Sequence, residues 1–414
     1  AWGKGNEGHL AQNSRTYYSS PVQIPGTTWH VGGIKAPASD HISFLKTDGT
    51  LWTWGYNANG QLAHNDRVTR SSPVQVPGSW SSIAEGTEST YAINTDGELW
   101  SWGYNVGGQL GQNNTTRYSS PVQIGTDTDW KQAFRTERTS HALKTDGTLW
   151  SWGNNLYGGA LGLNDDIRRS SPVQVGTDTD WDGMKLHGGS DSVNVIKSDG
   201  TMWTWGENQS GSLGQNQGSG AYSSPVQIPG TWTHNGGGSV NYYGIKSDGT
   251  LWGWGAGAQY AFGNESTTEY SSPIQIGSDT DWGGASETGS SIAGFRYGAL
   301  AIKSNGTLYG WGTPGTGDRA GILGQNDTAV QQTPVQIPGT TWSSITTGIP
   351  GVVNALKTDG TMWAWGGYAY GGLGINEGGD AGKRSSPTQV PGTWSQLSAV
   401  NSGSQNQAAF KPTS

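Results

Sequence analysis

Short runs of alternating apolar and polar residues recur along the chain, bounded by Gly, Pro and Asp. A typical pair is formed by residues 43–46 and 51–55, with Asp48-Gly49 between them. Asp-Gly between two such runs predicts a two-residue hairpin in which both central residues have positive φ. The segment 73–76 begins with Pro and predicts a further strand, and residues 80–83 predict a fourth. No helical periodicity is sustained over three turns, so the sequence predicts an all-β protein.

This group of four short strands recurs eight times. Each unit contains a Trp-Gly pair at the end of a strand-like run, at Trp2, Trp54, Trp102, Trp152, Trp205, Trp254, Trp311 and Trp365. Each unit also contains one Ser-Pro-Val-Gln segment or a near variant, and most contain Lys-Thr-Asp-Gly-Thr-Leu-Trp or a variant of it. Four short strands per unit of about 50 residues are typical of propeller blades.

The core of such a polar chain has to come from Trp. The chain has 22 Trp and 69 Gly, and only 32% of its residues are hydrophobic. Two Trp at positions i and i+2 of one strand share a face of the sheet, and a third follows each Ser-Pro-Val-Gln segment. All Trp occupy these three positions, and each could bury roughly 150–250 Å². We therefore predict that Trp stacked between blades replaces the missing aliphatic core.

The two ends of the chain match neighbouring strands of one unit. Residues 409–411 resemble the strand before the hairpin, and residues 1–3 resemble the end of the strand after it. Pairing of the ends would complete a blade and remove an exposed sheet edge. The predicted fold is thus a single all-β domain over residues 1–414, a closed propeller of eight four-stranded blades. Seven blades, or an open array, are the alternatives.

Together with Gly-x-Leu-Gly-x-Asn, as at residues 108–113, these landmarks resemble the RCC1-type β-propeller repeat over essentially the whole chain. Known members usually have seven blades, so eight units depart from the family pattern. The members include exchange factors, chromatin proteins, an enzyme inhibitor, a light receptor, and phage structural and secreted bacterial proteins. The resemblance therefore implies a fold but does not choose a function. The amino-acid sequence of the repeats is most similar to that of the phage and secreted bacterial members, and this resemblance implies a virion-surface or extracellular location.

Charge and composition exclude several partners. The chain has 23 basic and 31 acidic residues and a net charge of −8, so nucleic-acid binding has no electrostatic basis. No apolar stretch approaches the roughly 20 residues of a membrane-spanning helix, and membrane insertion is not expected. The absence of Cys excludes disulfides and thiolate metal sites.

Candidate chemistry is sparse. No His-Glu-x-x-His, Gly-x-Ser-x-Gly or paired-His spacing is present. The acidic segments 127–129, 178–180 and 279–281 have oxygen ligands that suit Ca²⁺, although Asp and Thr also stabilise turns, and a turn is favoured. We expect no enzymatic activity, no cofactor and no metal.

Two groups of residues are candidates for binding. The first stands three residues before the Pro of each Ser-Pro-Val-Gln segment and is mostly Tyr or Arg, residues that dominate binding hot spots. Its members are Tyr18, Arg70, Tyr118, Arg169, Tyr222, Tyr270 and Arg384, with Gln331 in the remaining unit. Alternatively, these side chains cover a Trp of the neighbouring blade by stacking or cation–π contact. The second group lies in irregular loops and comprises Tyr260, Phe295, Arg296, Tyr297 and Arg319.

The sequence thus predicts a rigid, non-enzymatic propeller that presents loops for protein or glycan binding. The favoured setting is a phage virion surface, as a fibre, tail or capsid-decoration component. A secreted or soluble regulator that binds one protein partner is the alternative, and an enzyme is the third and least favoured possibility.

Overall fold

A computed structural model of the 414-residue chain describes residues 1–30, 41–86, 88–136, 138–188, 191–238, 240–284, 290–315, 321–348, 351–367, 371–377, 383–397 and 406–411. Within these ranges the regular structure is almost entirely β. Two single turns of 3-10 helix, η2 (Gln209–Gly211) and η3 (Ala258–Tyr260), lie in connecting loops.

Six four-stranded antiparallel sheets follow one another in the described part of the chain, each with its strands side by side in chain order. The sheets are β5–β8 (Trp80–Glu85, Ser89–Asn94, Leu99–Gly103, Tyr118–Gln123), β9–β12 (Trp130–Arg135, Thr139–Lys144, Leu149–Gly153, Arg169–Gln174), β13–β16 (Lys185–Gly188, Ser192–Ile196, Met202–Glu207, Ala221–Ile228), β17–β20 (Trp232–Gly237, Asn241–Lys246, Leu251–Gly255, Tyr270–Gln275), β21–β24 (Ile292–Phe295, Gly298–Ile302, Leu308–Gly312, Gln331–Ile337) and β25–β28 (Trp342–Gly348, Val352–Lys357, Met362–Gly366, Arg384–Val390).

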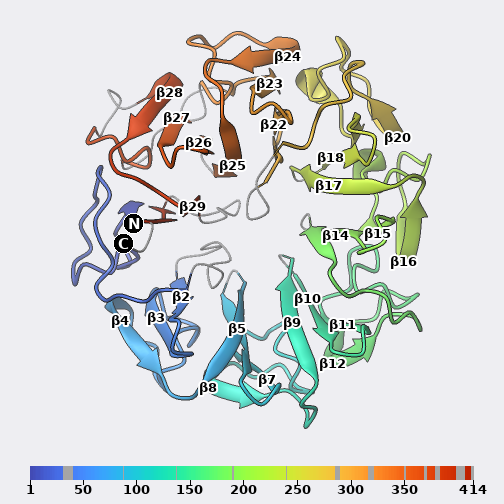
Figure 1. Ribbon diagram of the computed structural model, residues 1–414. Helices are drawn as coiled ribbons and strands as arrows, with labels where there is room; N and C mark the ends of the chain where they lie inside the picture. Colours follow the sequence, from blue (N-terminus) through green and yellow to red (C-terminus); the bar gives the residue numbers. More distant parts are fainter. Residues whose placement is uncertain are drawn as a thin grey trace.

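The remaining strands come from the two ends of the chain. A three-stranded sheet contains β2 (His41–Leu45), β3 (Leu51–Gly55) and β4 (Arg70–Val76), and an isolated bridge joins Trp29 to Lys46 beside it. Near the C-terminus, β29 (Gln396–Leu397) pairs with β31 (Ala409–Phe410). The N-terminal strand β1 (Trp2–Gly3) pairs with β30 (Asn406–Gln407), so the two ends meet, as Figure 1 shows.

The sheets are arranged around a common centre in Figure 1, with the lower-numbered strand of each sheet nearest to it. An all-β, propeller-like fold is therefore confirmed, and the predicted pairing between the two ends of the chain is present. The count of eight blades and their closure into a ring remain a prediction.

The Asp-Gly hairpins are real, but their predicted turn type is wrong. In the turn after β2, Gly49 has a φ of +80°, whereas Asp48 does not have positive φ. Instead, one Asp48 carboxylate oxygen accepts hydrogen bonds from the N–H (3.0 Å) and the hydroxyl (2.7 Å) of Thr50. The Lys46 N–H bonds to the Thr50 carbonyl at 2.9 Å, which makes a three-residue loop with Gly in the left-handed position. The Asp side chain thus stabilises the turn where a second positive φ had been expected.

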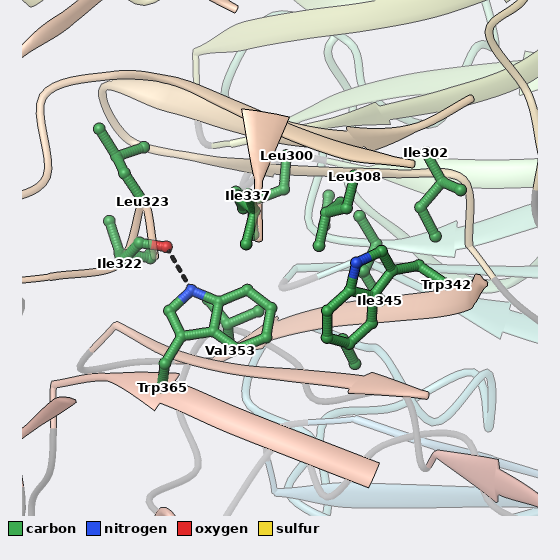
Figure 2. Packing of buried hydrophobic residues seen from close by; sticks show 12 residues of the cluster. Leu300, Ile302, Leu308, Ile322, Leu323, Ile337, Trp342, Ile345, Val353 and Trp365 are labelled. Carbon is green, nitrogen blue, oxygen red and sulfur yellow. Dashed lines mark hydrogen bonds between the residues drawn. The ribbon is translucent and has the colours of Figure 1, made fainter. Parts of the chain in front are cut away.

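The second Trp of each third strand fills the space between two sheets. Figure 2 shows Trp365 among Leu300, Ile337 and Val353, with its indole N–H donated to the Ile322 carbonyl at 2.9 Å. Each Trp of this set makes the same bond to the loop of the preceding unit. The other pairs are Trp54–His9, Trp102–Gln61, Trp152–Gln109, Trp205–Ala160, Trp254–Ser212, Trp311–Ala261 and Trp2–Gly372. These Trp are almost fully buried, so the predicted Trp core is confirmed.

Candidate functional site: lysine clefts between neighbouring sheets

A Lys at the end of the second strand lies between two aromatic rings in most units. One ring is the Trp that begins the first strand, and the other is the first aromatic residue of the third strand. We call this arrangement a lysine cleft. The Lys Nζ lies 3.7–5.1 Å from the two ring centroids in six clefts, those of Lys46, Lys144, Lys197, Lys246, Lys303 and Lys357. An ammonium group over an aromatic face is attracted by the ring quadrupole.

Three of these lysines also carry two carboxylate partners. Lys144 Nζ lies 2.7 Å from Asp127 and 3.1 Å from Asp129. The same pairing holds Lys197 to Asp178 and Asp180, at 3.0 and 2.6 Å, and Lys303 to Asp279 and Asp281, at 2.7 and 3.0 Å. The Asp residues come from the Gly-Thr-Asp-Thr-Asp-Trp spacer, or its Gly-Ser variant, that precedes the first strand. We call these the acid-paired clefts.

The clefts of Lys46, Lys246 and Lys357 have a different spacer, which contains Pro-Gly and no Asp. We call these the Pro-Gly clefts. Gly230 of one such spacer has a φ of +120°, and a Cβ there would lie 3.0 Å from Lys246 Cε. The corresponding Gly125 of an acid-paired cleft has a φ of +64° and open space around it. The shorter spacer thus passes close to the Lys stem, and only Gly fits at that point.

Burial and protonation differ between the two kinds of cleft. Lys144, Lys197 and Lys303 are buried, whereas Lys46, Lys246 and Lys357 are only half-buried. Burial by itself lowers the pKa of Lys144 and of Lys303, but hydrogen bonds and charge from the Asp pairs outweigh it and raise both pKa values. Burial lowers the pKa of Lys246, and Asp248 opposes this only partly. The ammonium group is therefore stabilised in the clefts of Lys144 and Lys303 and poorly solvated in the cleft of Lys246.

A cavity opens at one cleft of each kind. The cavity at the Lys144 cleft has a volume of about 330 Å³, and its walls include Asp127, Trp130, Trp150, Gln112 and Asn113. The cavity at the Lys246 cleft has a volume of about 360 Å³ and is lined by Lys246, Trp252, Gln215, Asn216, Ser272 and Pro273. Both lie where the loop of one unit meets the outermost strand of the next. Both volumes fall at the small end of the range of roughly 300–1,000 Å³ for small-molecule sites.

The predicted Tyr and Arg positions take equivalent places on successive sheets. Each faces the Gly of the Trp-Gly pair, as Arg70 faces Gly55 and Tyr118 faces Gly103. The same pairing places Tyr18, Arg169, Tyr222, Tyr270, Gln331 and Arg384. All are half-buried, and they are distributed one to a unit. They do not converge on a single site.

Five of these side chains contact the loop that precedes them. Arg70 pairs with Asp66 at 2.7 Å, and Arg169 pairs with Asp165. Arg384 likewise contacts Glu377. The hydroxyl oxygens of two tyrosines accept bonds from Asn side chains of their own loops, Tyr118 from Asn114 and Tyr270 from Asn264. Among the described residues, the guanidinium groups of Arg70 and Arg169 therefore form ion pairs with Asp side chains of their own loops. The alternative derived from the sequence was a stacking or cation–π contact with a Trp of the neighbouring blade.

The irregular loops place the second group of candidates apart from one another. Tyr260 ends η3 in the loop between β19 and β20 and has a φ of +62°. Phe295 ends β21 and packs against the core shown in Figure 2, while Arg296 and Tyr297 form the turn to β22. Arg296 is exposed, with its guanidinium 5.1 Å from the Tyr297 ring centroid. Arg319 lies outside the described residues.

The acidic segments have a role that the sequence interpretation missed. Their carboxylates face a Lys ammonium group, which contradicts the Ca²⁺ alternative for these Asp pairs. Among the described residues no group of three or more His, Asp or Glu is arranged to hold a metal ion. The signal available in the sequence was the Lys of the Lys-Thr-Asp-Gly motif or of its variants Lys-Ser-Asp-Gly and Lys-Ser-Asn-Gly, one of which follows each acidic spacer. In the same described ranges, no helix is long and apolar enough to cross a bilayer.

Comparison with known proteins finds sequence similarity to RCC1 repeats in part of the chain. A family model described as "Regulator of chromosome condensation (RCC1) repeat" matches residues 48–93 and 96–134. The human and mouse E3 ubiquitin-protein ligases HERC2 are each 35% identical to this chain over 77 residues, which are 18% of this chain and 2% of HERC2. The match thus spans about one fiftieth of the length of these relatives.

Several solved structures have a fold similar to that of this chain. The structure of Prp20p from Saccharomyces cerevisiae covers 90% of this chain and 94% of its own, with a TM-score of 0.63 and 18% identity. Human WBSCR16 covers 85% and 96%, respectively, with a TM-score of 0.60 and 20% identity. The predicted resemblance to the RCC1 repeat is confirmed over residues 48–93 and 96–134, and the likeness to these solved structures shows an RCC1-type propeller fold.

Proposed function

We propose that this protein is a non-enzymatic binding scaffold, built as a closed ring of eight blades. Contacts between the ends and their neighbours support the closure. Trp2 bonds to Gly372 at 3.0 Å, and the Asn376 N–H bonds to the Ser19 carbonyl at 2.7 Å. The same two bonds occur within the chain, as between Trp152 and Gln109 and between Asn113 and Ser170. An experimental structure with seven blades or with separated ends would overturn this closure.

The observation that carries the binding function is the repeated lysine cleft. Each cleft combines a cation with two aromatic rings at a junction between units, and two clefts open onto cavities. Such a combination recognises protein side chains or glycans, and repetition around a rigid ring would multiply weak contacts into strong binding. The Tyr and Arg positions and the turn at residues 295–297 are further contact candidates of the same scaffold.

The setting that we propose is extracellular or on a virion surface. It is supported by the wording of the repeats, the low content of charged residues and the lack of Cys. Recovery of the protein on purified particles or in the medium is expected. Exclusive recovery inside cells would contradict this location.

A soluble regulator of one protein partner is the second candidate. Its support is the similarity to Prp20p, whose published description names binding to Gsp1p and histones. That partner binding is a property of Prp20p, and its transfer to this chain is a proposal.

One experiment separates the two candidates. The full chain is immobilised at low and at high surface density and exposed to defined glycans and to candidate protein partners. A scaffold that uses repeated clefts should gain affinity steeply, by about 10²-fold or more, when the ligand is presented multivalently. A one-to-one soluble complex with no gain from multivalent presentation would favour the regulator and contradict the scaffold.

A further inference from the structure

The acid-paired clefts show what a lysine cleft accepts. In three units, two carboxylates approach the Lys Nζ to between 2.6 and 3.1 Å while the two rings flank the same group. These carboxylates are supplied by the chain itself. The cleft geometry is therefore compatible with a carboxylate at a specific position, held by charge-assisted hydrogen bonds.

The cleft of Lys246 has two Trp rings as well, but among the described residues no carboxylate forms an ion pair with its Lys. Lys246 Nζ lies 3.7 Å from the Trp252 ring centroid and 5.1 Å from that of Trp232. The nearest acidic residue in its turn is Asp248, whose carboxylate accepts the N–H and hydroxyl of Thr250 at 3.0 and 2.6 Å. The spacer contributes Thr231 where the acid-paired clefts have their second Asp. A half-buried ammonium group is thus left beside an open cavity.

The walls of that cavity have the chemistry of a sugar site. Gln215, Asn216 and Ser272 supply amide and hydroxyl groups, and Trp252 and Pro273 supply apolar surface. Sugar hydroxyls bond to amides and hydroxyls, while the C–H face of a pyranose packs on an aromatic or proline ring. A peptide carboxylate would use the Lys but has less use for this mixture of groups.

We propose that the cleft of Lys246 binds an acidic sugar residue, with the sugar carboxylate beside the Lys246 ammonium group in the place that Asp129 and Asp180 take in other units. The proposal rests on the binding function proposed above and names its ligand class. Lys46 and Lys357 occupy clefts with the same kind of spacer.

The test uses the full chain labelled with 5-fluorotryptophan, with the Trp252 signal assigned by a Trp252→Phe variant. The probe is methyl glucuronide, and methyl glucoside is its neutral counterpart. Methyl glucuronide should shift the Trp252 signal in a saturable way, and methyl glucoside should bind at least about tenfold more weakly. Equal binding of the two sugars, or no shift with the glucuronide, would overturn the proposal.

Two matched variants place the carboxylate. Thr231→Asp supplies an internal competitor and should weaken glucuronide binding at least about tenfold, while Thr231→Ser, whose side chain leaves that place open, should leave it unchanged. Conversely, Asp127→Ala/Asp129→Thr removes the internal carboxylates of Lys144, and glucuronide should then shift the Trp150 signal. Unchanged binding in Thr231→Asp contradicts the proposed position of the carboxylate.

A third arm distinguishes ligand classes. An Asp-rich peptide that binds at the Trp252 signal more tightly than methyl glucuronide would replace the sugar assignment with a peptide one. Failure of glucuronide with retained multivalent binding of other ligands would overturn this inference alone. Loss of multivalent binding altogether would overturn the scaffold function as well.

Discussion

The acid-paired and Pro-Gly clefts have Lys and aromatic residues at the same positions of the repeat. They differ in whether the charge of the Lys ammonium group is neutralised by Asp side chains of the chain itself. In the cleft of Lys197, two Asp side chains neutralise the ammonium group, and only 3% of the Lys side chain is exposed. In the cleft of Lys246, the spacer is shorter, the Lys is half-buried, and no ion pair is present among the described residues. The repeat therefore supplies the Lys and its two aromatic rings in both kinds of cleft. The spacer decides whether Asp side chains of the chain pair with the Lys ammonium group or leave it available to a ligand.

The largest effect should be common to both kinds of unit. Trp152 and Trp254 are fully buried and donate to Gln109 and Ser212 at 2.7 and 2.9 Å. Trp152→Ala and Trp254→Ala should each lower the free energy of unfolding by about 3–5 kcal/mol, because each leaves a large cavity between sheets. Urea unfolding followed by circular dichroism measures both. A difference of more than about 2 kcal/mol between them would show that the two kinds of unit differ in their cores as well as in their clefts.

A smaller loss should be confined to the acid-paired cleft. Asp178→Asn/Asp180→Asn leaves the Lys197 ammonium group buried without a compensating charge. We expect a loss of about 1–2 kcal/mol, below the value for a fully buried pair because both Asp side chains are at least half-exposed. Thr231→Asn, at the matching spacer position of the other cleft, is the control and should change stability by less than about 0.5 kcal/mol. Equal stability of the double variant and the parent protein would contradict an energetic role for the Asp pair.

Introducing one Asp into the spacer of a Pro-Gly cleft should give its Lys one of the two carboxylate partners that the acid-paired clefts have. Thr231→Asp places an acid beside Lys246 and should stabilise the protein by about 0.5–1 kcal/mol, with the gain reduced at high salt. The thermal midpoint at low and high salt measures this. A destabilised variant would show that the short spacer cannot bring a carboxylate to the ammonium group.

The smallest expected effect is a change in the free energy of unfolding at alkaline pH. The contributions of Lys144 and Lys246 to this free energy should change with opposite sign as the pH rises. The pKa of Lys144 is raised by its Asp partners, so its stabilising contribution is present at neutral pH and is lost as the pH rises through that elevated value. The pKa of Lys246 is lowered by burial from its ordinary value of 10.5, so its charge costs stability at neutral pH. That cost disappears as the pH rises through the window that ends at 10.5.

Lys144→Met and Lys246→Met are the variants that isolate these contributions. Unfolding free energies of each variant and the parent protein are compared from about pH 8 to about pH 11. The deficit of Lys144→Met should shrink as the pH rises, whereas any advantage of Lys246→Met should shrink over the same range. The same sign of pH dependence in both variants would contradict the contrast.

Much of this architecture could be predicted from local sequence signals. The positions of Trp, Gly and Asp-Gly set the strands, the faces of the sheets and the hairpins, because each depends on residues only a few positions apart. The ionic contacts of Arg70 and Arg169 also have a local basis, since Asp66 and Asp165 stand four residues earlier. The turn type was wrong because the Asp48 carboxylate, bonded to Thr50, replaces the expected second positive φ.

The lysine clefts required the folded molecule. Asp127 and Lys144 are 17 residues apart, and Asn113, from the loop of the preceding unit, joins them only when two units pack together. Sequence spacing does not show that a spacer loop will reach the end of a second strand, because its path depends on the neighbouring sheet.

By itself, the sequence determined the β character, the repeat and the identity of the buried aromatic residues, since these follow from periodicity and from the size of Trp. The tertiary structure alone decided which lysines meet a carboxylate, which cavities stay open, and how Trp2 contacts Gly372 across nearly the whole chain. The physical reason is that charge pairing and cavity formation depend on distances of a few ångströms between segments that are remote in sequence.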